Sequence, residues 1–173
     1  DQRISWNRIN AFHMDEYIGV LPDAPQSFGN FLRIRIFDKV PFKNVYYLNG
    51  HATDLEEECT RYTSLLSQFP TDIVCLGIGE NGHIAFNDPD VANFNDHKLV
   101  KIVKLDHVCR QQQVNEKCFE TLEQVPTEAL TLTIPALLKA KWMFCIVPFK
   151  NKSQAVYRTI HGDISEKCPA SIL

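Results

Sequence analysis

The chain has no long apolar run and no cluster of basic residues. None of its hydrophobic stretches approaches the roughly 20 residues that a membrane helix needs, and nothing at the start resembles a secretory signal peptide. The net charge is -3, and the 18 lysines and arginines are scattered over 173 residues. We therefore expect neither nucleic acid nor a membrane as a partner. With 45% hydrophobic and 23% charged residues, the composition is that of an ordinary globular protein.

The cysteines show no ordered spacing. None of them forms a Cys-x-x-Cys pair, and Cys75 and Cys145 lie inside apolar runs, where a thiol acts as a small hydrophobic group. The full set is Cys59, Cys75, Cys109, Cys118, Cys145 and Cys168. This pattern is typical of reduced thiols in a cytoplasmic protein, so we expect neither a disulfide framework nor a zinc site.

A strand followed by a glycine-rich loop stands out in residues 71–89, TDIVCLGIGENGHIAFNDP. Residues 73–76 are apolar and rich in β-branched side chains, which predicts a strand buried on both faces of a parallel sheet. Gly77, Gly79 and Gly82 then let the backbone take positive φ angles or pass close to a ligand. In open α/β sheets, ligands bind beyond the carboxyl ends of the strands. We therefore expect Gly79 and Gly82 to line a substrate site.

The same glycines match a dinucleotide-binding spacing by letter. That fingerprint has to open a helix and needs an acidic residue further along to hold a ribose. Here Pro89 disfavours a long helix after the loop, and no acidic residue stands convincingly at a strand end at the expected offset. The spacing alone therefore gives only weak support to dinucleotide binding.

Strand-like and helix-like segments alternate along the chain. The strand candidates lie at 8–14, 44–48, 73–76, 99–105, 129–134 and 142–147. Helical segments follow the candidate N-caps Ser27, Asp54 and Asp106, Pro135 stands in the first turn of a short helix, and Gly162 ends the last one. The pattern predicts an α/β fold in a single domain, with a doubly wound, mostly parallel, Rossmann-like sheet and helices on both faces.

Two adjacent carboxylates, Asp15 and Glu16, end the first strand. Because side chains alternate along a strand, one of them can face a cleft while the other faces the protein. On the residues alone, the pair fits a solvated acidic turn better than a functional site. His83, taken alone, likewise fits a loop histidine bonded to the backbone better than a catalytic group.

Two motifs bring the chain close to a known family. GIGENGHIAFNDP, residues 77–89, resembles the signature of the glucosamine-6-phosphate deaminase (isomerase) family, and FHMDEYIG, residues 12–19, resembles its other hallmark. The motifs stand in the family's order, and the resemblance extends over nearly the whole chain. It implies conversion of glucosamine 6-phosphate to fructose 6-phosphate and ammonia by proton transfer, with no redox cofactor and no metal.

The resemblance also implies catalytic roles. Asp15 would take the proton from C2 of the sugar, and His83, whose side chain titrates near neutral pH, would open the sugar ring. Asp88 stands where the family usually has Glu and would orient the imidazole, although it is one methylene shorter. Asn81 can only form hydrogen bonds and would position the substrate. Without the resemblance, Asp88 fits a turn residue before Pro89.

Further residues are expected to hold the substrate. Glu16 would support Asp15 at the binding site. Lys152 resembles the family's phosphate lysine and precedes a helix, whose free N–H groups favour an anion. Lys117 stands near an expected Arg, after the insertion-like run at 111–113, and cannot copy a bidentate Arg clamp. Taken alone, both lysines also fit ordinary surface charge.

Both ends of the sequence look truncated. The chain opens on Asp1-Gln2-Arg3-Ile4 without a Met and stops on Ser171-Ile172-Leu173. The resemblance implies more chain on both sides, including a phosphate loop that precedes residue 1. We therefore expect residues 1–173 to be one sugar-phosphate isomerase/deaminase domain that lacks N- and C-terminal portions. Its binding partner would be a small molecule, an amino-sugar phosphate, and assembly into a homo-oligomer is left open.

Three other functions stay open. A deaminase acting on galactosamine 6-phosphate would share the mechanism, and Asp88 and the Gln-rich run are the departures that make a changed substrate plausible. A 6-phosphogluconolactonase is brought close by the same resemblance, although residues 84–87 argue against it. A non-catalytic sugar-phosphate sensor is the third alternative, against which the intact Asp15 and His83 count.

Overall fold

The computed structural model describes residues 3–173, so Asp1 and Gln2, with which the sequence opens, lie outside the described residues. The strands are β1 (Asn10–Phe12), β2 (Asp15–Tyr17), β3 (Asn44–Tyr46), β4 (Ile73–Leu76), β5 (Val100–Lys104), β6 (Glu128–Leu132) and β7 (Trp142–Cys145). The α-helices are α1 (Phe28–Leu32), α2 (Leu55–Gln68), α3 (His107–Asn115), α4 (Ile134–Leu138) and α5 (Ser153–His161). Short turns of other helix types are η1 (Trp6–Arg8), η2 (Arg33–Phe37), η3 (Leu122–Gln124), η4 (Lys150–Lys152) and η5 (Pro169–Ile172).

The helices begin where the sequence places their caps. Ser27, Asp54 and Asp106 each accept a hydrogen bond from the backbone N–H three residues further on, which satisfies one of the free donors of a first helical turn. Pro135 lies in the first turn of α4, as predicted. Gly162 follows the last residue of α5. The predicted helix starts are therefore confirmed.

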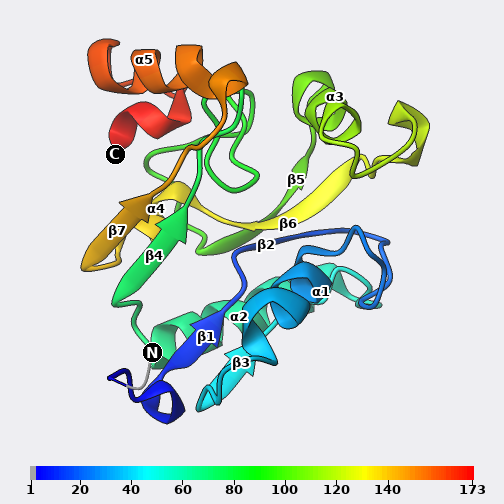
Figure 1. The fold of residues 1–173 in the computed structure, drawn as a ribbon, viewed down its shortest axis with the longest axis vertical. Helices are drawn as coiled ribbons and strands as arrows, with labels where there is room; N and C mark the ends of the chain where they lie inside the picture. The colour runs from blue at the N-terminus through cyan, green and yellow to red at the C-terminus, as the bar shows by residue number, and fades with distance from the viewer. Residues whose placement is uncertain (1–2) are drawn as a thin grey trace.

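The strands form three small sheets that contain both parallel and antiparallel pairs. β1 pairs with β3 and β4 with β7 in parallel, while β2 and β5 flank β6 in an antiparallel sheet (Figure 1). The predicted α/β class, with parallel strands and helices, is confirmed, but the continuous sheet is divided. A strand usually returns parallel to the preceding one through a helical crossover. Residues 77–99, between β4 and β5, contain no helix, and β5 pairs antiparallel with β6 in a sheet separate from that of β4.

Helix α2 packs its apolar stripe into the main core. Cys59, Tyr62 and Leu66 are buried there with residues of β4, β5 and β6, as the helical spacing predicts. The Tyr62 hydroxyl donates to the carbonyl of His13 at 2.6 Å and accepts from its N–H at 2.9 Å. These two bonds fix the chain between β1 and β2, directly before Asp15.

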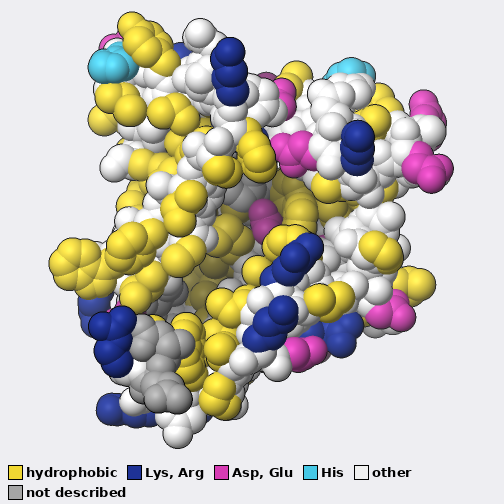
Figure 2. Space-filling view, viewed as in Figure 1, with side chains coloured by type: hydrophobic (Ala, Val, Ile, Leu, Met, Phe, Trp, Pro, Cys, Tyr) yellow, Lys and Arg dark blue, Asp and Glu magenta, His cyan; other side chains and the backbone are white. Residues whose placement is uncertain are grey.

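One face of the β4–β7 pair is apolar and exposed. Trp142 is 67% exposed and Ile146 71%, and Ile73 and Phe144 lie open as well. Hydrophobic side chains gather over these strands in the space-filling view (Figure 2). The prediction that residues 73–76 are buried on both faces is therefore wrong, because β4 alternates between exposed and buried positions and the described residues leave its outer face uncovered. No helix within residues 3–173 has the length and apolar character to cross a membrane.

Candidate active site

The loop after β4 is folded back on itself and tied to two other parts of the molecule. The Gly79 N–H donates to the carbonyl of His83 at 2.9 Å, and Gly82 adopts a positive φ of 93°, which glycine takes without strain. The Gly82 carbonyl accepts from the N–H of Ala170 at 2.8 Å. The Phe86 N–H donates to the hydroxyl of Thr131, at 3.1 Å, on the central strand β6. The loop is thereby held at a fixed position above the antiparallel sheet.

Three of the predicted catalytic residues meet within this loop. The Nδ1 atom of His83 lies 2.9 Å from Oδ1 of Asp88 and 2.8 Å from Oδ1 of Asn81. The Asn81 side-chain NH₂ donates to the same Asp88 oxygen at 2.8 Å. Asp88 therefore reaches the imidazole despite its shorter side chain. A proton on Nδ1, donated to Asp88, leaves Nε2 with a free lone pair.

The charge balance around Asp88 favours its ionised form. Asp88 is 1% exposed, and burial by itself raises the pKa of its carboxyl group. The hydrogen bond and charge of His83, with the hydrogen bond from Asn81, outweigh burial and lower that pKa overall. An ionised Asp88 stabilises the imidazolium that forms when His83 accepts a proton.

Gly79 provides the space for the imidazole of His83. A Cβ atom built on Gly79 would lie against the Cε1, Nδ1 and Nε2 atoms of the ring, closer than any real Cβ contact. Residue 79 therefore determines where His83 can lie. The sequence predicts Gly79 as a substrate-site residue, and the structure shows its contact with the catalytic candidate.

Asp15 comes from the neighbouring strand and is electrostatically coupled to the loop. Asp15 pairs with Thr131 in the register of β2 and β6, and Thr131 is the residue that holds Phe86 of the loop. Burial raises the pKa of the Asp15 carboxyl to about 7; the negative charge of Glu16 adds to this rise, and the positive charge of His83 opposes it. Figure 2 shows a hollow in the middle of the face of the molecule that is in view, with an acidic side chain on the floor of the hollow.

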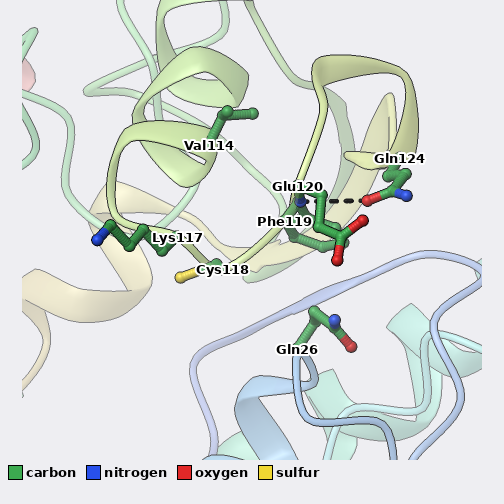
Figure 3. Close-up of a pocket in the computed structure, with 7 residues that line it drawn as sticks. All are labelled: Gln26, Val114, Lys117, Cys118, Phe119, Glu120 and Gln124. Carbon is green, nitrogen blue, oxygen red and sulfur yellow. Dashed lines mark hydrogen bonds between the residues drawn. The ribbon is translucent and has the colours of Figure 1, made fainter.

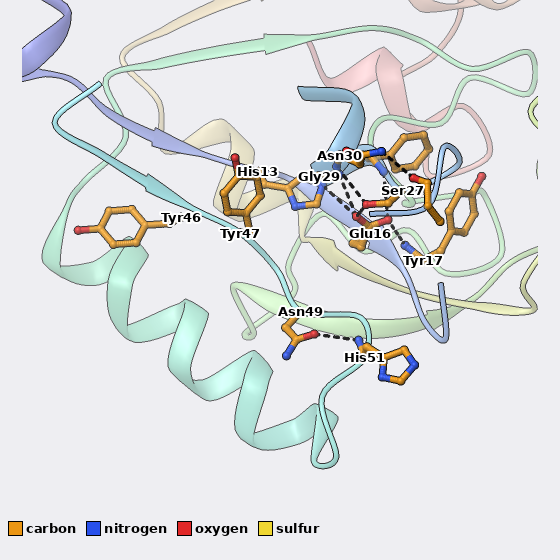
Figure 4. A network of polar contacts seen from close by, with 12 residues as sticks. His13, Glu16, Tyr17, Ser27, Gly29, Asn30, Tyr46, Tyr47, Asn49 and His51 are labelled. Carbon is orange, nitrogen blue, oxygen red and sulfur yellow. Dashed lines mark hydrogen bonds and ion pairs between the residues drawn. The ribbon is translucent and has the colours of Figure 1, made fainter. Parts of the chain in front are cut away.

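Glu16 points away from Asp15 and into the start of α1. Its two oxygens accept from the Ser27 hydroxyl at 2.7 Å and from the N–H groups of Tyr17, Phe28 and Gly29 at 2.9–3.2 Å (Figure 4). Glu16 also lines a cavity of about 150 Å³ that includes neither Asp15 nor His83. The prediction that one carboxylate faces the protein is met by Glu16. Its acceptors are already engaged, which fits support of β2 better than direct substrate binding.

Lys152 lies in η4, directly before α5, as the sequence predicts. Its Nζ lies 3.4 Å from Oε1 of Glu116, and its side chain is 15% exposed. The same Glu116 oxygen accepts from the side-chain NH₂ of Gln112 at 2.9 Å, and Gln112 accepts from the N–H of Glu80 at 3.2 Å. A chain of polar contacts therefore links Lys152 to the glycine-rich loop.

Lys117 lies in a different environment. It has a positive φ of 61° and lines an open cavity of about 840 Å³. Gln26 reaches toward this cavity from the segment before α1, opposite the loop that follows α3 (Figure 3). The residues that line it are Gln26, Val114, Lys117, Cys118, Phe119, Glu120 and Gln124. Asp15 and His83 are not among them, so the structure does not place Lys117 in the cluster around His83.

Comparison with known proteins decides the family. Residues 1–173, the whole chain, match the family described as glucosamine-6-phosphate isomerases/6-phosphogluconolactonase. The chain belongs to this family. The glucosamine-6-phosphate deaminase of Bacillus cereus (strain B4264) is 40% identical over 171 residues, and that of Bacillus cytotoxicus is 39% identical. In both comparisons the match covers 99% of this chain and 63% of the relative.

Solved structures of the glucosamine-6-phosphate isomerase/6-phosphogluconolactonase family show the same fold. A monomeric glucosamine-6-phosphate deaminase superposes with a TM-score of 0.90 at 35% identity, over 98% of this chain and 70% of that one. A 6-phosphogluconolactonase from Thermotoga maritima superposes with a TM-score of 0.73 at 23% identity, over 95% of this chain and 68% of that one. The second likeness shows the fold alone.

Two residues that the sequence does not predict as site residues lie next to the cluster of Asn81, His83 and Asp88. The side-chain NH₂ of Asn81 lies 3.4 Å from Oδ2 of Asp106, which the sequence marks only as a helix cap. Cys109, 1% exposed, lies beside His83 and Asp88, and irregular cysteine spacing carries no signal for that position. Burial, together with the charges of Asp88 and Asp106, raises the pKa of the Cys109 thiol, so it is not a thiolate nucleophile at neutral pH.

Proposed function

We propose that this chain carries the acid–base centre of a glucosamine-6-phosphate deaminase, which converts glucosamine 6-phosphate and water to fructose 6-phosphate and ammonia. The observation that carries the proposal is the arrangement of His83, oriented by Asp88, within electrostatic reach of an Asp15 whose pKa is raised to about 7. The 40% identity to glucosamine-6-phosphate deaminases supports the choice of substrate. The chain spans 63% of the length of those relatives.

Ring opening is the first task in this proposal. With its Nδ1 proton directed at Asp88, His83 presents Nε2 as a base for the hydroxyl on C1 of the sugar. The proton passes to the ring oxygen as the C1–O5 bond breaks, and the open-chain aldehyde results. Asn81, which contacts both His83 and Asp88, keeps these two side chains aligned while the proton is transferred.

Proton transfer between C2 and C1 is the second task. Ionised Asp15 takes the proton from C2, which is acidified by the adjacent aldehyde, and an enol at C1–C2 forms. Return of the proton to C1 leaves an imine at C2. Water adds to this imine and ammonia leaves, which gives the ketone of fructose 6-phosphate. A carboxyl group with a pKa of about 7 is suited to give and take a proton at neutral pH.

The pH dependence of the reaction follows from Asp15. Because the base must be ionised, kcat/KM is expected to rise with pH through an apparent pKa near 7. Glu16→Gln removes a negative charge that raises the pKa of Asp15, so this rise should move to lower pH. The measurement is kcat/KM against pH for both proteins. A rate that stays level from about pH 5.5 to about pH 8 would contradict the assignment of Asp15 as the base.

Lys152 is proposed to bind the phosphate group. Its ammonium lies at the start of α5, where a helix N-terminus also favours an anion. Lys152→Met should raise KM for glucosamine 6-phosphate about tenfold with a smaller change in kcat, since a charge-assisted hydrogen bond is lost. Lys150→Met, in the same turn but exposed, is the matched control. An equal rise of KM in both variants would show a general charge effect instead.

The direct test is ammonia release from candidate substrates. Purified protein is incubated separately with glucosamine 6-phosphate and galactosamine 6-phosphate, and ammonia is measured with a coupled assay. Ammonia from the first sugar supports the proposal, and ammonia from the second alone keeps the mechanism but changes the substrate. Release from neither sugar would overturn the proposal and direct attention to 6-phosphogluconolactone hydrolysis or to sugar-phosphate binding without catalysis.

A further inference from the structure

Three potential metal ligands of different chemistry meet beside the glycine-rich loop. One ligand atom each from His83, Asp88 and Cys109 lies within 4.8 Å of the other two. They come from two separate segments, the loop after β4 and helix α3. A nitrogen, a carboxylate oxygen and a sulfur ligand form a set that suits zinc and similar transition-metal ions.

The cluster has a buried acceptor that lacks a partner with hydrogen-bond geometry. Oδ1 of Asp88 is used by His83 and Asn81, whereas Oδ2 has no partner with hydrogen-bond geometry among the described residues, and the carboxyl group otherwise interacts with the thiol of Cys109. Asp88 and Cys109 are each 1% exposed. A buried carboxylate oxygen without a donor is costly, and a metal ion would satisfy it.

The spacing requires only small shifts: His83 Nδ1 and Asp88 Oδ1, now 2.9 Å apart, have to open slightly to admit an ion, and ligand atoms near the 4.8 Å limit have to move closer. Bond lengths of 2.0–2.3 Å in a tetrahedral zinc site put neighbouring ligand atoms roughly 3.5 Å apart. The fourth position would fall to water or to Oδ1 of Asn81, which already lies 2.8 Å from Nδ1 of His83. Three protein ligands with a fourth position open to water are a known composition of zinc sites.

We propose that His83, Asp88 and Cys109 bind a zinc-class divalent cation and that this binding switches off the proposed deaminase reaction. Nδ1 is the His83 atom nearest to Asp88, so the metal takes Nδ1 and the imidazole carries its one proton on Nε2. Nε2 can then no longer accept the proton of the sugar hydroxyl. The thiol proton of Cys109 leaves to solvent, and one carboxylate and one thiolate balance the two charges of the ion.

The binding half of this proposal is independent of catalysis, whereas the inhibition half rests on the proposed function. Cobalt(II) is therefore the first probe, because a cobalt–thiolate bond gives a charge-transfer band in the near ultraviolet whether or not the protein is active. Cobalt titration of the purified chain should give this band at saturation with one equivalent, and zinc should remove it. A chain that releases no ammonia but shows the band would overturn the proposed function and not the metal site.

Cys109→Ala should remove the cobalt–thiolate band, and it should raise the zinc concentration for half-inhibition at least about tenfold, relative to each protein's own metal-free rate. Cys118→Ala is the matched control, since Cys118 lies in the same part of the chain but is exposed. If Cys109→Ala does not fold by circular dichroism, Cys109→Ser replaces it. Absence of the band in the unmodified chain, or its persistence in the Cys109 variant together with loss in Cys118→Ala, would overturn the site.

Discussion

Asp15→Asn is expected to lower kcat for ammonia release by about 10² to 10⁴-fold, the usual contribution of a positioned general base. The substitution keeps the size of the side chain and its place in β2, but an amide cannot take the C2 proton. KM should change far less, because the phosphate and His83 contacts are untouched. Steady-state kinetics with glucosamine 6-phosphate, measured above pH 7 where Asp15 is ionised, provides the comparison.

Stability measurements separate this loss from unfolding. The raised pKa of Asp15 means that, between about pH 4 and about pH 7, the folded chain holds a proton that the unfolded chain has lost. Stability from this group is therefore fully present at low pH and declines as pH rises through about 7. Because an amide does not ionise, the Asp15→Asn variant does not lose stability in this pH range. At pH 8 its unfolding temperature should therefore equal or exceed that of the unmodified chain. A kcat within about threefold of the parent would remove Asp15 from the base role.

The sequence predicts local features of the site well because each depends on neighbouring residues. The caps Ser27, Asp54 and Asp106 depend on side chains that reach three residues along the chain. The contact of His83 with Asp88 spans five residues of one loop. Such features follow from short-range chemistry and from the family motif, so they can be predicted before any fold is known.

Features that join distant segments could not be predicted in the same way. Glu16 is satisfied by the start of α1, Lys152 by Glu116, and Cys109 comes to lie beside Asp88 only because α3 packs against the loop. Burial patterns also depend on the neighbours that a strand acquires. The apolar run in β4 indicates a strand, but its exposed outer face is determined by packing and not by the run itself.

Gly79→Ala is expected to lower kcat about 10²-fold or more, because misplacing a catalytic group by about 1 Å is enough for such a loss. The new methyl group would occupy the space of the His83 ring. The colliding atoms belong to a side chain that can rotate, so the imidazole should leave Asp88 while the loop backbone holds. Activity should therefore fall much more than the unfolding temperature does.

Gly77→Ala is the matched control for this experiment. It lies in the same loop, but its added Cβ meets only the carbonyl oxygen of Ile146 at 3.5 Å, an ordinary contact. Both variants add one methyl group and both restrict the unfolded chain equally, so a general effect of losing a loop glycine should appear in both. A large loss of kcat in Gly79→Ala alone assigns the effect to the position of His83. Equal losses in the two variants would instead show that the loop tolerates no side chain. The proposal that Gly79 leaves the space for the His83 ring would then be wrong.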